Sequence, residues 1–320
     1  METRKIISFG NSSYVVSLPK DWVKENKLSK GDLLHMDQKN DEILIYPGRN
    51  GEKKIEPKTI IIEGDGKDYD MIQTEIVSAY LNNYDVIEVR GKLSKERAVH
   101  VKSLLRNLSG IEIIRQDAQK ITAKDLLNIN EISIETLIRR MDNIIRSMLT
   151  DSIQSIKEDM YEEIYERDQD VNRLVFLAYR VLRAAIIDSK IAKNLQKANI
   201  ELLFSQVLIE KLEKVADKSK RIARYLKEAN LKQSEKEEVT KMYESIKGCY
   251  LEVMKAYYKK DLDLAFKAEN AGFQHIKKLN KLIKERQNAP AHMVVEQMKS
   301  MVISIKNIAR AVIGMEKNVW

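Results

Sequence analysis

"IETLIRRMDNIIRSML" (residues 134–149) repeats apolar side chains at the spacing of a helix, and it decides the fold of the C-terminal half. The apolar positions are Ile134, Leu137, Ile138, Met141, Ile144, Ile145, Met148 and Leu149. They recur at i, i+3, i+4 and i+7, the pattern of an amphipathic helix. The segment lies between Gly110 and Gly248, a stretch with neither glycine nor proline. Because those residues are the strongest breakers of regular structure, the stretch predicts long helices separated by polar turns.

The same periodicity extends to the C-terminus. We expect five further helices, at residues 160–188, 198–229, 234–258, 262–284 and 291–311. Ser234 and Glu237 have the spacing of a capping box, which places the start of one of these helices at Ser234. Six helices with short polar joints predict two three-helix units packed as antiparallel bundles. The helical domain is expected over 130–320, with its two units at about 130–230 and 234–316.

Residues 58–123 alternate differently and predict a small α/β domain. Strands are expected at 59–62, 86–89 and 111–114, with amphipathic helices at 69–81 and 95–108. This βαβαβ order at short spacing predicts helices packed on one sheet. Gly64 and Gly66 have no third glycine at the start of a helix, so we interpret them as a turn and not as a nucleotide-binding loop.

Residues 1–50 predict a third, very small domain. Short strands are expected at 6–7, 14–18, 33–36 and 43–46, with a helix from Lys20 to Glu25 and a hairpin turn at Asn40-Asp41. A domain of this size is marginal on its own, because it buries too little apolar surface. The domain is therefore expected to borrow strands from a second copy of the chain. The whole sequence predicts a multidomain α+β fold.

Composition limits the class of protein. The chain has 320 residues, a net charge of +8 and a pI near 9.1, which favours an acidic partner such as nucleic acid. The single cysteine, Cys249, excludes an internal disulfide, and its apolar neighbours predict burial. We expect no signal peptide, no membrane insertion and a cytoplasmic location. The absence of a catalytic triad, a P-loop and a histidine-based metal motif predicts a regulator that is not an enzyme.

"RKIISFGNSSYVVSLPKDWVKENKLSKGDLLHMDQKNDEILIYP" (residues 4–47) resembles the SpoVT/AbrB-like, MazE-type domain. The landmarks are the Gly10-Asn11-Ser12 turn, Leu18-Pro19-Lys20, the Lys30-Gly31-Asp32 corner and the final Ile43-Leu44-Ile45 strand. The resemblance implies a swapped-hairpin β-barrel built by two interlocked chains, which agrees with the argument from size. It also implies DNA binding through the basic N-terminal strand and the turn after it.

Six residues are expected to contact DNA under this resemblance. Arg4, Lys5 and Lys20 would neutralise phosphates, and Asn11, Ser12 and Ser13 would bond to the DNA backbone or to base edges. Two features depart from the related antitoxins. Apolar and polar residues replace the basic ones before Gly10, and Ser17 stands where an arginine is frequent. The alternative that this domain only dimerises the chain stays open.

The C-terminal half resembles a PhoU-type domain. The resemblance rests on "YERDQDVNRLVFLAYRVLRAAI" (residues 165–186) and "IEKLEKVADKSKRIARYL" (residues 209–226), which provide Asp168 and Asn172 on one helix and Glu213 and Asp217 on another. The family holds iron or zinc clusters with such carboxylates, so the resemblance implies a metal site at Asp168, Glu213 and Asp217.

The second repeat departs further from the family pattern. Lys299 and Ile303 stand where the acids of one helix are expected, and Phe273 follows Glu269 on the other, so the second site is expected to be lost. Surrounding lysines leave open the alternative that the acids of the first repeat form only helix-surface ion pairs.

The two resemblances together predict a dimeric, DNA-binding transcriptional regulator of phosphate uptake. This joint architecture resembles a group of archaeal PhoU-like regulators. The alternative is a protein-only adaptor that inhibits a phosphate transporter or sensor, with the N-terminal domain serving dimerisation alone. A third hypothesis, the antitoxin of a toxin pair, is disfavoured because antitoxins add a short tail where this chain adds a large folded domain.

Overall fold

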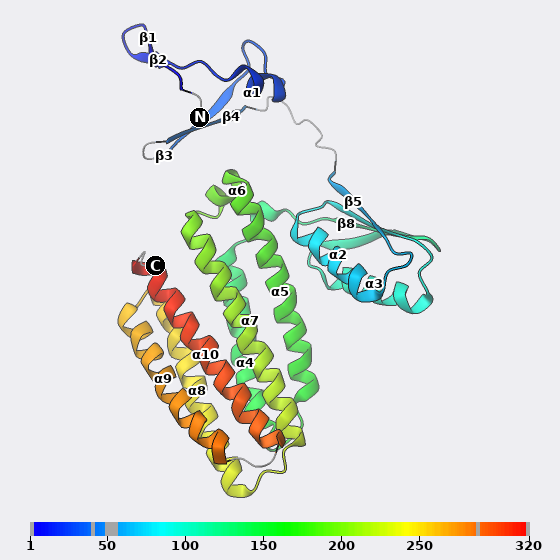
Figure 1. Ribbon diagram of the computed structural model, residues 1–320, viewed down its shortest axis with the longest axis vertical. Coiled ribbons are helices and arrows are strands. Elements are labelled where there is room, and N and C mark those ends of the chain that lie inside the picture. Colours follow the sequence, from blue (N-terminus) through cyan, green and yellow to red (C-terminus); the bar gives the residue numbers. More distant parts are fainter. Residues whose placement is uncertain (1–2, 40–41, 49–56, 286–288, 318–320) are drawn as a thin grey trace. The chain divides into compact units, whose positions relative to one another are not determined.

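The computed structural model describes residues 3–39, 42–48, 57–285 and 289–317. The chain divides into two compact units, Met1–Pro57 and Lys58–Trp320. Figure 1 shows the strands of the first unit in blue, the α/β region in cyan and the helices from green to red.

The first unit consists of two separate hairpins and one short helix. Strand β1 (Ile7–Phe9) pairs antiparallel with β2 (Ser13–Val15), and β3 (Leu34–Lys39) pairs antiparallel with β4 (Glu42–Pro47). Helix α1 (Lys20–Glu25) starts after Pro19, as predicted. The predicted turn at Asn40-Asp41 lies outside the described residues.

The α/β region forms one four-stranded sheet in the order β5-β6-β8-β7. The elements are β5 (Thr59–Glu63), α2 (Tyr69–Leu81), β6 (Val86–Arg90), α3 (Lys95–Asn107), β7 (Ile111–Gln116) and β8 (Lys120–Asp125). Strands β5 and β6 are parallel, as the connection through α2 requires, and the other pairings are antiparallel. The predicted βαβαβ order was incomplete, because β8 follows β7 through a tight turn and inserts between β7 and β6.

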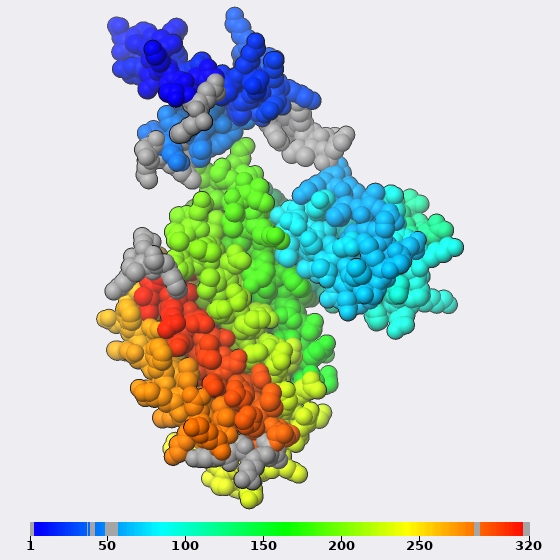
Figure 2. Space-filling view, in the orientation of Figure 1, coloured from blue at the N-terminus to red at the C-terminus, as the bar shows by residue number. Residues whose placement is uncertain are grey.

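The rest of the chain is helical and encloses one continuous apolar core. After a short 3-10 turn (Ile129–Glu131), the helices are α4 (Ile134–Gln154), α5 (Tyr161–Ile187), α6 (Ser189–Asn194), α7 (Asn199–Glu228), α8 (Gln233–Lys259), α9 (Leu262–Glu285) and α10 (Ala289–Lys317). Helices α4, α5 and α7 form the first repeat, and α8, α9 and α10 form the second. Helices α7 and α10 pack side by side along the bundle (Figure 2).

Two local predictions about the helices have different outcomes, and one short helix was not predicted. Cys249 is buried, as predicted, and burial raises the pKa of its thiol to about 11. The predicted cap of α8 was wrong, since Ser234 lies inside the helix and the backbone N–H of Lys232 donates to Glu235 Oε2 at 2.9 Å. Helix α6, one and a half turns long, was not predicted.

A buried arginine joins the α/β region to the helices inside the second unit. Arg180 of α5 is 3% exposed. Its Nε donates to Asn83 Oδ1 at 2.8 Å, its Nη2 pairs with the Asp125 carboxylate, and its guanidinium stacks 4.7 Å from the centre of the Tyr80 ring. Asn83, two residues after the end of α2, has a φ of 55°, a conformation that asparagine tolerates better than most residues.

A second buried polar group joins the two helical repeats. Asp142 of α4 is 2% exposed. It accepts hydrogen bonds from Tyr250 and Tyr258 of α8, each at 2.9 Å, and pairs with Arg146 Nε at 2.9 Å. Burial and the Asp142 charge raise the pKa of Tyr250, so its phenol remains a hydrogen-bond donor at neutral pH. The network fixes the register of α4 against α8.

Candidate functional site

The six predicted DNA-contacting residues lie at the two ends of the first hairpin and at the start of α1. Arg4 and Lys5 precede β1, Asn11 and Ser12 form the turn with Gly10, and Ser13 begins β2. The register pairs Ile7 with Val15, so the basic residues lie at the open end of the hairpin and the Asn-Ser turn lies at its closed end. Lys20 is the first residue of α1.

All six of these side chains are exposed, and the turn between them has a defined shape. Gly10 takes a φ of 67°, where a side chain would be strained, and its carbonyl accepts a hydrogen bond from Ser8 Oγ at 3.3 Å. The hairpin therefore offers amide and hydroxyl groups at one end and positive charge at the other. That separation fits a duplex, whose base edges and phosphates are read by different side chains.

The first unit has no buried core within a single chain. None of the described side chains in residues 3–48 is buried. Large apolar side chains are exposed on its strands and loops, among them Ile6 (73%), Phe9 (70%), Tyr14 (76%), Leu33 (62%) and Met36 (66%). Exposed apolar surface of this kind marks an interaction site, because leaving it in water costs about 25 cal/mol per Å².

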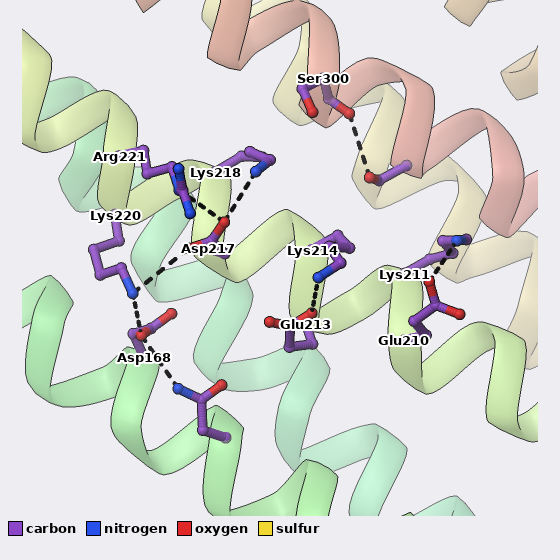
Figure 3. A network of polar contacts seen from close by, with 12 residues as sticks. Asp168, Glu210, Lys211, Glu213, Lys214, Asp217, Lys218, Lys220, Arg221 and Ser300 are labelled. Carbon is purple, nitrogen blue, oxygen red and sulfur yellow. Dashed lines mark hydrogen bonds and ion pairs between the residues drawn. The ribbon is translucent and has the colours of Figure 1, made fainter. Parts of the chain in front are cut away.

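The predicted metal residues lie on α5 and α7 within a network of charges (Figure 3). Asp168 of α5 is 2% exposed and is paired with Lys220 Nζ of α7 at 2.5 Å. Asn172, one turn along α5, points its Nδ2 at the same carboxylate oxygen at 3.4 Å. Burial opposes the charge on Lys220, but the hydrogen bond from Lys220 to Asp168 raises the pKa of the ammonium, which stays charged.

Three acids on α7 are each followed directly by a lysine that pairs with them. The pairs are Glu210–Lys211 (2.8 Å), Glu213–Lys214 (3.1 Å) and Asp217–Lys218 (2.9 Å). Asp217 also pairs with Arg221 Nε at 2.9 Å and with Lys220 Nζ at 3.6 Å. Burial alone would raise the pKa of Asp217, but these cations lower it below its usual value.

The second repeat has one interhelical ion pair at the corresponding face. Glu269 of α9 pairs with Arg310 Nε of α10 at 2.7 Å. Phe273, one turn after Glu269, lies under Lys306, whose Nζ is 4.0 Å from the ring centre. Lys299 and Ile303, which stand where the sequence pattern expects acids, both lie on α10.

The residues in these places do not fit the predicted iron or zinc site as they are arranged. Within the described parts of the chain, no three or more histidine, cysteine, aspartate or glutamate side chains converge closely enough to hold an ion. Asp168 and Asp217 instead direct their oxygens at Lys220, Lys218 and Arg221. A cation would have to displace these groups to reach the carboxylates.

Two polar centres escaped the sequence-based predictions. Arg180 stands in the quoted PhoU-like stretch, yet its partners lie 55 and 97 residues away in the α/β region. Asp142 interrupts the apolar stripe of α4, and a charged residue on an apolar face is the one signal that could have revealed it.

A membrane-spanning stretch is not present in any helix of the described residues.

Comparison with known proteins identifies two parts of the chain. Residues 7–53 match the family described as antidote-toxin recognition MazE, bacterial antitoxin, and residues 138–226 match the PhoU domain. The crystal structure of PhoU from Pseudomonas aeruginosa is 15% identical with a TM-score of 0.49, over 58% of this chain and 96% of that chain. No match was found among curated proteins.

The matched regions coincide with structural elements. The MazE match begins at β1 and includes Asn11, Ser12, Ser13 and Lys20. The PhoU match runs from α4 into α7, which is the first helical repeat and contains the charged α5–α7 face. The chain therefore carries a MazE/AbrB-like domain at its N-terminus and a PhoU domain in its helical region.

Proposed function

We propose that the protein is a dimeric DNA-binding regulator of phosphate homeostasis that performs no catalysis. The observation that carries the proposal is the first unit, which exposes its apolar side chains and joins basic residues and an Asn-Ser turn in one short hairpin. A second copy would cover the apolar surface and place two such hairpins beside each other. Paired hairpins suit a duplex, since a two-fold protein reads two half-sites.

The helical domain is the signal-receiving part under this proposal. The PhoU match supports a role in phosphate homeostasis, and the buried Arg180 contacts give that domain a rigid connection to the α/β region. The signal would be phosphate itself or contact with a phosphate transporter or sensor. The alternative is a protein-only adaptor, in which the helical domain inhibits such a partner and the first unit only dimerises the chain.

Dimerisation through the first unit predicts a change of mass on truncation. The full chain is expected to have twice its chain mass of 37.1 kDa in solution, and a chain lacking residues 1–57 is expected to be monomeric. Light scattering coupled to size-exclusion chromatography measures both. A truncated chain that stays dimeric would place the dimer contact in the helical unit instead.

DNA binding is tested by single substitutions in the full chain. Lys5→Gln is expected to weaken binding to all duplexes, because each dimer loses two phosphate contacts and the slope of log K against log salt falls by roughly 1.8. Asn11→Ala is expected to lower the preference for selected genomic fragments over random DNA by about tenfold or more, the value of one bidentate base contact. Fluorescence anisotropy at several salt concentrations measures both quantities.

Lys24→Gln is the matched control for these substitutions. Lys24 is exposed on α1 and lies outside the predicted contact set, so its substitution changes the net charge equally and is expected to leave the affinity for the selected fragments within about twofold. A full chain that binds no fragment selectively at low salt would favour the adaptor. Under that reading, a pull-down of the transporter or sensor would survive removal of residues 1–57.

A further inference from the structure

Each helical repeat has an ion pair between its second and third helices. Asp168 is the eighth residue of α5, and Glu269 is the eighth residue of α9. Their cations are Lys220 on α7 and Arg310 on α10. The Nζ–Oδ2 distance is 2.5 Å in the first repeat, and the Nε–Oε1 distance is 2.7 Å in the second.

The residue types differ between the repeats, while the charges are the same. Aspartate with lysine in one repeat becomes glutamate with arginine in the other, each time between the second and third helices. Both repeats therefore place a negative charge on the second helix against a positive charge on the third.

On the second helix of each repeat, the position one turn further along carries no carboxylate. The twelfth residue is Asn172 in α5 and Phe273 in α9. Asn172 donates to Asp168, and Phe273 lies against the aliphatic and charged end of Lys306. In the first repeat Lys220 Nζ lies 2.5 Å from Asp168 and 3.6 Å from Asp217, so a cation already neutralises the carboxylates that a metal ion would need.

We infer that each repeat is closed by its own cation, Lys220 or Arg310, which replaces a metal ion between the second and third helices. The helical domain then needs neither iron nor zinc to fold. The inference goes beyond the proposed function. Its test measures metal content and thermal stability, so a chain that fails to bind DNA would not contradict the inference.

The first measurement is the metal content of the untagged full chain. The chain is incubated with Fe²⁺ or Zn²⁺, desalted and measured by inductively coupled plasma mass spectrometry. We expect less than about 0.1 metal ion per chain, and a melting midpoint that EDTA shifts by less than about 1 °C, because removing a ligand that is not bound changes no stability. A content near one ion per chain that falls on Asp168→Asn would overturn the inference.

The second measurement uses variants of the tethered cation. Lys220→Gln is expected to lower the melting midpoint by about 5 °C, since it leaves the buried Asp168 carboxylate without a cation, whereas Lys220→Arg keeps the charge and the midpoint. Added Zn²⁺ is expected to raise the midpoint of Lys220→Gln but not that of the natural chain.

Lys214→Gln is the matched control, because Lys214 is on the same helix, is 47% exposed and pairs with its neighbour Glu213. Its midpoint is expected to stay within about 1 °C of the natural chain. Equal midpoints for Lys220→Gln and Lys214→Gln would contradict the inference. If Lys220→Gln fails to fold, the metal content of the natural chain and the midpoint of Lys220→Arg decide the question.

Discussion

Arg180→Ala is expected to lower the free energy of unfolding of the second unit by about 3–5 kcal/mol, the largest effect of any single substitution considered. Arg180 and Asp125 are 3% and 7% exposed in their side chains, so the substitution leaves a carboxylate buried without its cation. It also removes the hydrogen bond to Asn83 and the stacking on Tyr80. Burial opposes the charge on Arg180, and Asp125 raises the pKa of the guanidinium, so the cation is present at every accessible pH.

Urea denaturation followed by circular dichroism measures this loss, with Arg183→Ala as the control. Arg183 lies one turn further along α5 and is exposed, so its substitution is expected to cost less than about 0.5 kcal/mol. Arg180→Ala is also expected to separate the unfolding of the α/β region from that of the helices, giving two transitions. A loss equal to that of Arg183→Ala would show that the two regions do not depend on this arginine.

Asp142→Ala is expected to have the second largest effect, about 2–4 kcal/mol. The substitution leaves the hydroxyls of Tyr250 and Tyr258 and the guanidinium of Arg146 without their common acceptor between α4 and α8. Tyr258→Phe removes one donor only and is expected to cost about 1 kcal/mol.

The control for Asp142 is Asp170→Ala on α5. Its side chain is 59% exposed and lies 3.8 Å from Arg173, so a loss below about 0.5 kcal/mol is expected in the same urea denaturation. If Asp142→Ala and Asp170→Ala unfolded at the same urea concentration, the buried network would contribute nothing to the contact between the two repeats.

The helices were predictable from their apolar spacing. Helix α2 runs from Tyr69 to Leu81 as the periodicity indicated, with Asp68 accepting from the backbone of Met71 at its start. Strand β8 was missed for a physical reason. Only Ile121 and Ala123 face the apolar core, between polar Lys120, Thr122 and Lys124, so the strand presents little hydrophobic pattern.

The candidate sites were predictable only in part. A family resemblance located the acids on α5 and α7. It did not locate Lys220, the partner of Asp168, which is 52 residues away in the sequence. The spacing of residues along one helix cannot reveal a contact between two different helices. For the same reason the contacts of Arg180 could not be predicted, because its partners are in another region of the chain. The DNA-contacting residues remain a prediction, and so does the second copy of the chain that would cover the exposed apolar side chains of the N-terminal unit.

The most direct test of the proposed function is the mass of the complex between the full chain and a selected duplex. Native mass spectrometry at low salt is expected to give two chains per duplex, each of 37.1 kDa, with dissociation as salt rises and no complex for a chain lacking residues 1–57. A duplex that stays free of the full chain, or one that binds the truncated chain equally well, would contradict a DNA-binding dimer built on the N-terminal unit.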